Sequence, residues 1–243
     1  MVRDLEFVFT QRYKVAPNKT TDNSARESGF NEADYRLWGI SIPRLLGAAA
    51  LFSCGFVVIC DIVMWFLVEG YNPLSQTISE LAAGPHHWLQ DLGIVVFVFG
   101  VLCLTADLFL RREKGWKPWL VRGTMLLVAL DIALIALWNE YGDGERGGFV
   151  IHNYLVFLLY PSVPVILWFG TSVLPARKGE MTTLAKGTAI VWLFLAPIFF
   201  FVPSSIDGAY ERLLGLLLIG AVLIAAWRLF LEPRSEDDPE NFS

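Results

Sequence analysis

Six long apolar segments, separated by shorter polar ones, organise the sequence. Their approximate bounds are Leu45–Val68, Leu89–Leu110, Pro118–Trp138, Phe149–Leu174, Leu184–Val202 and Tyr210–Leu231. Each segment is long enough to cross the apolar core of a bilayer, which is about 30 Å thick. The pattern predicts an all-α polytopic membrane protein. We expect a bundle of six transmembrane helices over residues 44–231, a flexible N-terminal tail over 1–43 and an acidic C-terminal tail over 232–243.

The polar segment Tyr71–Pro85 lies between the first two spans and has the signals of a short helix. Asn72 suits an N-cap, Pro73 suits the first helical position, and the pair Gly84-Pro85 is a stop signal. The apolar residues that share one helical face are Leu74, Ile78 and Leu81. We therefore predict a short amphipathic helix in the first outer loop, lying on the membrane surface with its apolar side down. A capped connector without function is the alternative.

The orientation follows from the connections in which lysine and arginine collect, because such loops stay in the cytoplasm. The second and fourth connections hold Arg111, Arg112, Lys114, Lys117, Arg122, Arg177, Lys178 and Lys186. The first connection has no basic residue, and the third and fifth have only Arg146 and Arg212. We predict a multi-pass protein of the plasma membrane with both termini in the cytoplasm and Tyr71–Pro85 outside.

Composition narrows the possible partners. The chain is 55% apolar and only 18% charged, whereas soluble domains are about 25% charged. No basic patch interleaves with aromatic residues, so the sequence does not support nucleic-acid binding and membrane lipids are the expected partners. Cys54, Cys60 and Cys103 all lie in apolar runs. We expect these cysteines to pack as small apolar residues, without a disulfide framework or a metal, and no cofactor is indicated.

Three aspartates lie inside the predicted spans. A carboxylate at the centre of a lone membrane helix costs about 2.5–3.5 kcal/mol, and such residues normally face the bundle interior. Asp107 precedes Arg111 by four residues, and an ion pair between them explains its position. Asp61 and Asp131 have no such local partner and lie in the outer half of the membrane. Either one can also be a protonated, inert hydrogen-bond donor.

Further polar residues gather at the outer level of the bundle. They are Ser79, Glu80, Asn139, Glu140, His152, Asn153, Ser204, Ser205, Asp207, Glu211 and Arg212. Together with the two outer aspartates, they predict one outward-facing polar mouth. The alternative for each residue taken alone is that it lies at a solvent-exposed helix end and has no function. Glu211 suits a helix N-terminus, and Arg212 would then pair with Glu140 or Glu80.

Two kinds of chemistry at this mouth have weaker support. His86, His87 and His152 are the only histidines, and with carboxylates they could hold a zinc ion with an open position. No HxxxH or HExxH spacing is present, so these histidines are poor metal candidates. Ser79 could act as a nucleophile with His152 as its base only if the outer helix folds over the bundle.

Three motifs resemble a known family. "YNPLSQTISELAAGP" after the first span is similar to the Ser-Glu-Leu-Gly-type signature of domain-of-unknown-function family 998, six-helix bacterial and archaeal membrane proteins. His152 and the "GAYERL" of Gly208–Leu213 are also similar to that family, although Ala82-Ala83 stand where a glycine is expected. The resemblance covers roughly residues 45–231. It implies the six-helix fold and no established activity, and it favours the positions Ser79, Glu80, His152, Glu211 and Arg212.

Three functional hypotheses follow. In the leading one, an outward-facing polar cavity binds a lipid or small amphiphile, or passes a small solute. A network of Glu80, His152, Glu211 and Arg212 would then pin the outer helix, and Asp61 and Asp131 would line the cavity below. The second hypothesis is a membrane-embedded lipid hydrolase, with or without a metal. The third is a structural or assembly partner that binds no ligand.

Overall fold

A computed structural model describes residues 36–37, 40–138, 151–173 and 180–231. Within these ranges it contains two short strands, seven α-helices and one 3₁₀ helix. Their bounds are β1 Arg36–Leu37, β2 Ile40–Ser41, α2 Ile42–Leu67, α3 Ile78–Ala83, α4 His87–Leu110, α5 Trp116–Leu137, α6 Ile151–Gly170, α7 Glu180–Ile198, η3 Phe199–Phe201 and α8 Asp207–Phe230. The predicted C-terminal tail and almost all of the N-terminal tail lie outside the described residues, as do Asn139 and Glu140.

Six of these helices are long and apolar enough to cross a membrane, which confirms the predicted fold class. The predicted spans overlap them closely, although α6 ends at Gly170, four residues before the predicted end. Their outward surface is apolar, as the bilayer requires: Phe66, Leu137 and Phe201 are 83%, 75% and 84% exposed. The pattern did not predict the two-residue antiparallel pairing of β1 with β2 directly before α2.

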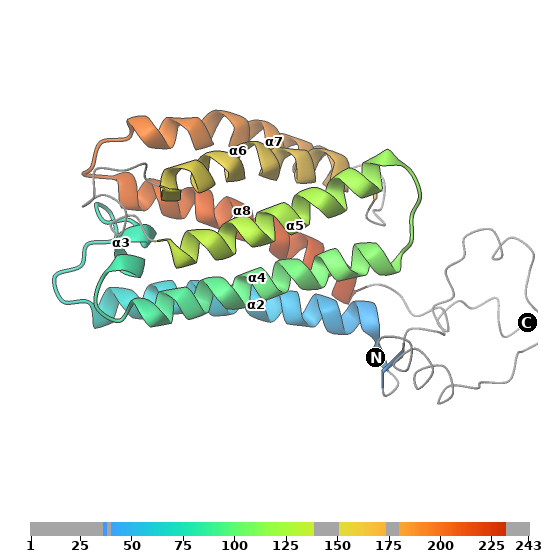
Figure 1. Cartoon of the computed structure of the whole chain (residues 1–243), viewed down its shortest axis with the longest axis horizontal. Helices are drawn as coiled ribbons and strands as arrows, with labels where there is room; N and C mark the ends of the chain where they lie inside the picture. Colours follow the sequence, from blue (N-terminus) through green and yellow to red (C-terminus); the bar gives the residue numbers. More distant parts are fainter. Residues whose placement is uncertain (1–35, 38–39, 139–150, 174–179, 232–243) are drawn as a thin grey trace, which may run out of the picture. The chain divides into compact units, whose positions relative to one another are not determined.

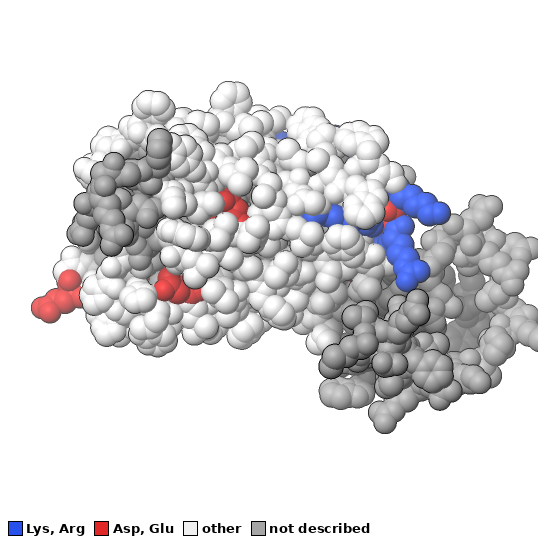
Figure 2. All heavy atoms as spheres, in the orientation of Figure 1, with Lys and Arg blue, Asp and Glu red and all other residues white. Residues whose placement is uncertain are grey.

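The helices pack mainly against their neighbours in sequence, and α8 returns to pack on α2. Figure 1 shows α3 and its loops at one end of the bundle and the α4–α5 connection at the other. We call these the capped end and the basic end. The basic end is defined by Arg111, Arg112, Lys114, Lys117, Arg122, Lys186 and Arg228. Figure 2 shows Lys and Arg gathered toward the basic end and away from α3.

Small residues allow a close contact between α2 and α4. Gly100 on α4 lies directly against Ser53 on α2, since a Cβ atom added at Gly100 would lie 1.8 Å from Ser53 Oγ. Small residues let membrane helices approach until their backbones nearly touch. On α5, Ala129 is part of the main core cluster and Ala133 packs against it. Cys54, Cys60 and Cys103 are all buried and free.

Helix α6 keeps its helical course through Pro161 and Pro164. A proline lacks the N–H that would bond to the carbonyl four residues earlier, so Pro164 leaves the carbonyl of Tyr160 without its helical donor. The indole N–H of Trp192 on α7 donates to that carbonyl at 3.0 Å. This bond fixes α7 against α6 at the level where α6 lacks a backbone bond.

At the basic end, Asp107 and Arg111 form the predicted ion pair. Arg111 Nε lies 2.6 Å from Asp107 Oδ2, and both side chains are largely buried. Arg122 is also bound there: its guanidinium donates to the carbonyls of Leu108 and Glu113. The pair explains the position of Asp107 within its span.

Candidate functional site

Helix α3 begins later than the sequence predicts. Its N-cap is Thr77, whose hydroxyl accepts the N–H of Glu80 while the Glu80 carboxylate accepts the N–H of Thr77. This reciprocal capping box satisfies two backbone donors of the first turn. Asn72 instead starts a tight turn, in which its side-chain oxygen accepts the N–H of Leu74. The prediction of a helix start at Pro73 is therefore wrong, because a stronger cap lies five residues after Asn72.

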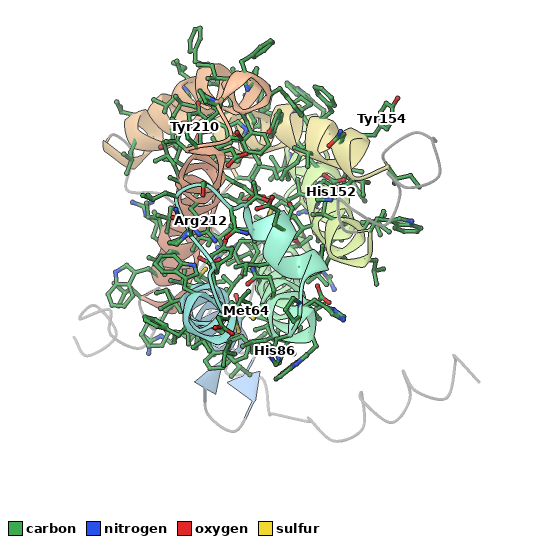
Figure 3. All side chains as sticks on the ribbon, turned by 90° about the vertical axis from the view of Figure 1, so that its left-hand side faces the viewer. Met64, His86, His152, Tyr154, Tyr210 and Arg212 are labelled. Atoms are coloured by element: carbon green, nitrogen blue, oxygen red, sulfur yellow. The ribbon has the colours of Figure 1, made fainter. Side chains whose placement is uncertain are left out.

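The orientation of α3 also differs from the prediction of a helix lying apolar side down on the membrane. Leu81 is buried, but Leu74 precedes the helix and is 59% exposed. Ser79, predicted on the outward polar face, instead contacts groups of the bundle. Figure 3 looks at the capped end and shows α3 lying across it, with Arg212 and His152 to either side. The short helix closes the end of the bundle.

Arg212, in the second turn of α8, is the centre of the contacts that hold this closure. Its Nε and Nη2 atoms each lie 3.1 Å from one carboxylate oxygen of Asp61 on α2. Its Nη1 donates to the carbonyls of Pro73, Gln76 and Gly208 at 2.9–3.0 Å. Arg212 therefore joins α2, α8 and the loop before α3, and its ionic partner is Asp61, where the sequence suggested Glu80 or Glu140.

Two aromatic residues complete the surroundings of this arginine. Trp65 donates its indole N–H to Asp61 at 3.1 Å, and Tyr71 accepts from Arg212 Nη2 and donates from its hydroxyl to the Gln76 carbonyl. The guanidinium carbon of Arg212 also lies over both rings, 5.4 Å from the centre of the Trp65 ring and 5.6 Å from the centre of the Tyr71 ring. Burial raises the pKa of Tyr71 to about 12, against a smaller opposing effect of Arg212. Every N–H of Arg212 therefore has an acceptor, which leaves none for a ligand.

A second polar cluster joins α3 to α6 and α8. Ser79 Oγ lies 3.2 Å from His152 Nε2 and 3.1 Å from Glu211 Oε1. The other oxygen of Glu211 accepts the backbone N–H of Ile78. His152 Nδ1 lies 2.9 Å from the carbonyl oxygen of Trp138 at the end of α5. Ser79 thus joins α3 to α6 and α8, and His152 extends the cluster to the end of α5.

The hydrogens available on Ser79 and His152 determine which hydrogen bonds this cluster can form. A carbonyl oxygen only accepts, so His152 Nδ1 must carry a hydrogen and donate to Trp138. Ser79 has one hydroxyl hydrogen, which can go to Glu211 or to His152 Nε2. With the Glu211 carboxylate ionised, both contacts are hydrogen bonds at once only when Nε2 also carries a hydrogen and donates to Ser79. In that state a positive imidazole faces the carboxylate of Glu211 through the serine hydroxyl, which is a stabilising arrangement. With Nε2 unprotonated, His152 is instead a base beside Ser79.

Backbone contacts bring the loop still closer to α8. The Ala209 N–H donates to the carbonyl of Leu74 at 3.0 Å. A Cβ atom added at Gly208 would lie 2.1 Å from the Gln76 carbonyl oxygen, so only glycine allows this approach. The "GAYERL" segment therefore supplies a docking surface for the loop as well as two charged side chains.

Beneath α3 lies a cavity of about 380 Å³, which we call the capped cavity. Its polar lining residues are Asp61, Thr77, Ser79, Gln90, His152, Asn153, Glu211 and Arg212. Deeper in the bundle its walls are apolar and come from all six spans, for example Val57, Phe97, Ile132, Leu159, Phe199 and Leu218. The site thus combines a polar rim with an apolar interior.

Gln90 on α4 is a lining residue that the sequence reasoning did not single out. Its side chain is only 1% exposed, and its amide oxygen has no hydrogen-bond partner among the described residues. A buried acceptor without a donor costs about 1–3 kcal/mol. The available signal was a glutamine near the start of an apolar run, where a polar amide needs a partner.

The structure separates the two outer aspartates that the sequence grouped together. Asp61 lines the capped cavity, whereas Asp131 is 1% exposed and is not one of the cavity's lining residues. Neither carboxylate oxygen of Asp131 has a partner in the described part of the chain. The expectation that both residues line one cavity therefore fits Asp61 only.

The remaining predicted residues lie as follows. Glu80 caps α3, and His86 and His87 are exposed at the start of α4. His87 Nδ1 lies 2.9 Å from Asp91 Oδ2, while His152 is buried and bonded to Ser79 and Trp138. Across the described residues, no three His, Cys, Asp or Glu side chains are grouped closely enough to hold a metal ion.

Comparison with known proteins gives one match. A family model described as "Protein of unknown function (DUF998)" matches residues 45–228, which covers all six spans and both polar clusters. No curated protein and no solved structure matches the chain.

Proposed function

The chain belongs to the DUF998 family of proteins of unknown function, and from the geometry of its site we propose that it binds a neutral amphiphile in the capped cavity. The observation that carries this proposal is the combination of an apolar interior with a polar rim closed by α3. An acyl chain would lie among the apolar walls, and a small headgroup would lie near Ser79, Gln90 and Asn153. Ligand pockets of this kind pair apolar walls with a few polar groups that fix orientation.

The charges at the rim favour a neutral, hydroxyl-bearing headgroup. Asp61 and Arg212 neutralise each other, and the donors of Arg212 are all occupied. Glu211 faces His152 through Ser79, so the described residues of the rim leave no unpaired positive charge for a carboxylate or phosphate. The buried oxygen of Gln90 needs a hydrogen donor, which a ligand hydroxyl or amine would supply. A monoacylglycerol or long-chain alcohol meets these conditions better than a fatty acid.

The position of the site supports an outer-leaflet ligand. Lysine and arginine gather toward the basic end (Figure 2), and basic residues mark the cytoplasmic side of bacterial and eukaryotic membrane proteins. In this orientation the capped end faces outward from the plasma membrane and both termini are cytoplasmic. The amphiphile would then enter from the outer leaflet beneath α3.

Photolabelling tests the proposal. A long-chain alcohol with a diazirine in its chain should label peptides from the walls of the capped cavity, such as those containing Phe97 and Leu218. Unlabelled 1-oleoylglycerol should compete, and oleate should compete less well. Labelling confined to outward residues such as Phe66 and Phe201, and insensitive to both competitors, would reject the cavity as a binding site.

One observation favours a second candidate function, hydrolysis of an ester in the same cavity. Ser79 Oγ lies 3.2 Å from His152 Nε2, and the Trp138 carbonyl orients the imidazole. Nucleophile, base and orienting group are the parts that acyl transfer needs. Ser79 would attack the carbonyl carbon, and His152 would take the serine proton and pass it to the departing alcohol. Water would then hydrolyse the acyl-serine and restore the hydroxyl.

Hydrolysis requires His152 Nε2 to be unprotonated, whereas with Glu211 ionised the arrangement that satisfies both contacts of Ser79 has it protonated. A fluorophosphonate probe separates the two cases, because it modifies only activated serines. Modification of Ser79 that is lost in His152→Gln would support hydrolysis. A wild-type protein that stays unmodified while it binds 1-oleoylglycerol would leave the cavity as a binding site only.

A further inference from the structure

A second cavity, of about 290 Å³, lies toward the basic end of the bundle. Helices α4, α5, α6, α7 and α8 line it, and its walls are almost entirely apolar. Its polar lining residues are Asp107, Thr171, Thr182, Thr188 and Arg228. We call it the basic-end cavity. Leu216 and Leu218 line both cavities, so the two follow one another along α8.

A small apolar cluster borders both cavities. Val163, Trp192, Ala196 and Leu214 pack together and are all buried. Val163 lines the basic-end cavity, whereas Trp192 and Leu214 line the capped cavity. The hydrogen bond from Trp192 to the Tyr160 carbonyl holds this cluster in place. The two cavities are therefore neighbours along α8, and each has its own polar lining residues.

Arg228 is the basic residue that lines the basic-end cavity. It lies in the last turn of α8 and lines the cavity, and its side chain is partly buried. Unlike Arg111, Arg122 and Arg212, it forms no hydrogen bond or ion pair with another described residue. A cation favours a helix C-terminus, which accounts for its charge, but the described residues supply no acceptor for its N–H donors.

The charged residues near the rim of the basic-end cavity favour the binding of an anion. Asp107, the acidic lining residue, is bound to Arg111. Lys186 lies on α7 with its ammonium 5.2 Å from the centre of the Trp168 ring, and Lys114 is exposed at the same end. A guanidinium binds phosphate oxygens through paired, charge-assisted hydrogen bonds. Basic residues at a membrane surface also attract anionic lipids.

We propose that the basic-end cavity is a second lipid site, which takes an acyl chain of an anionic phospholipid and binds its phosphate at Arg228. The two cavities would then select lipids of different charge: a neutral amphiphile at the capped end and an anionic phospholipid at the basic end. The site does not depend on the capped cavity or on any chemistry at Ser79.

Two glycines on α8 provide a matched pair of variants. Gly220 lines the basic-end cavity, and a Cβ atom added there meets nothing within 4 Å. Gly215 lines the capped cavity, where the nearest atom to an added Cβ is Ile78 Cδ1 at 3.9 Å. Leucine at either position should fit without disturbing the backbone and should occupy one cavity while leaving the other open.

The experiment measures lipid retention by the full chain. Delipidated protein in dodecyl maltoside is mixed with dioleoyl-phosphatidylglycerol or dioleoyl-phosphatidylcholine, and native mass spectrometry counts the bound lipids. Wild type and Gly215→Leu should each retain one phosphatidylglycerol in preference to phosphatidylcholine. Arg228→Gln should bind phosphatidylglycerol about tenfold more weakly, a difference of about 1.4 kcal/mol, and Gly220→Leu should lose the preference.

Several results would overturn the proposal. Equal retention of the two lipids would remove the selectivity for negative charge. Wild-type affinity in Arg228→Gln would place the phosphate elsewhere, and wild-type retention in Gly220→Leu would place the chain outside the cavity. Competition by glycerol 3-phosphate as strong as that by the lipid would show that the headgroup binds without a chain.

Discussion

The guanidinium of Arg212 on α8 binds both carboxylate oxygens of Asp61 on α2, each at 3.1 Å. This pair joins residues 151 positions apart and explains how an aspartate can lie inside the first span. The side chains are only 11% and 15% exposed, so water screens the pair weakly. Because the same arginine also binds three carbonyls of the capped end, the pair couples bundle packing to the position of α3.

Arg212→Ala should destabilise the folded bundle by about 3–5 kcal/mol, because it leaves the Asp61 carboxylate buried without its partner. The loop of residues 68–77 should also become sensitive to protease. Thermal unfolding in mild detergent and limited proteolysis measure the two effects. Arg112→Ala, at an exposed position of the basic end, is the control and should change neither. An unchanged midpoint together with an intact loop would show that the Arg212 contacts do not hold the capped end.

Gly208→Ala should loosen the capped end by about 1–3 kcal/mol, because the added methyl group overlaps the Gln76 backbone. Gly123→Ala, where an added Cβ meets nothing within 4 Å, is the matched control. That control should be neutral or stabilising by up to about 1 kcal/mol, since glycine is unfavourable inside a helix. Equal midpoints for the two variants would mean that the loop does not dock on Gly208.

Tyr71 gives the protein a dependence on alkaline pH. Burial raises its pKa from 10.0 to about 12, so the folded state keeps the phenol proton that the unfolded chain loses above pH 10. The stability contributed by this group is therefore complete below pH 10 and is lost as the pH rises toward 12. In ultraviolet titrations, the difference between wild type and Tyr71→Phe should show one phenol ionising near pH 12. A difference spectrum that titrates at pH 10 would show that Tyr71 is solvated.

Asp131→Ala should stabilise the protein by about 1 kcal/mol or more, because the carboxyl group is buried and the described residues give it no partner. Lipid retention in the capped cavity should not change, because Asp131 does not line it. A clear fall in the unfolding midpoint of Asp131→Ala would show that the carboxyl group makes a stabilising contact in the folded protein.

The sequence was sufficient to predict the six spans and the gathering of polar groups at one end of the bundle. Long apolar runs specify membrane helices directly, because length and hydropathy are local properties. The ion pair of Asp107 with Arg111 was equally accessible, since residues four apart share a helix face. The same spacing relates Asp61 to Trp65, so the indole bond could also have been found.

The partners across the bundle could not be predicted in this way. The contacts of Arg212 with Asp61 and Tyr71 depend on which helices are neighbours and on how far α3 folds over them. The predicted start of α3 was wrong because Asn72-Pro73 and Thr77-Glu80 are both good N-terminal signals. In the folded protein α3 begins after the capping box of Thr77 and Glu80, and Arg212 binds the carbonyl of Pro73 in the loop before it.

Retention of a neutral amphiphile by the two cavity-filling variants tests the central claim most directly. After exposure to 1-oleoylglycerol and removal of free lipid, native mass spectrometry should find it bound to wild type and to Gly220→Leu, but not to Gly215→Leu, whose added side chain occupies the capped cavity. Retention by Gly215→Leu equal to that of wild type would contradict the claim that the amphiphile lies beneath α3. Absence of the lipid from all three proteins would favour a structural role without a ligand.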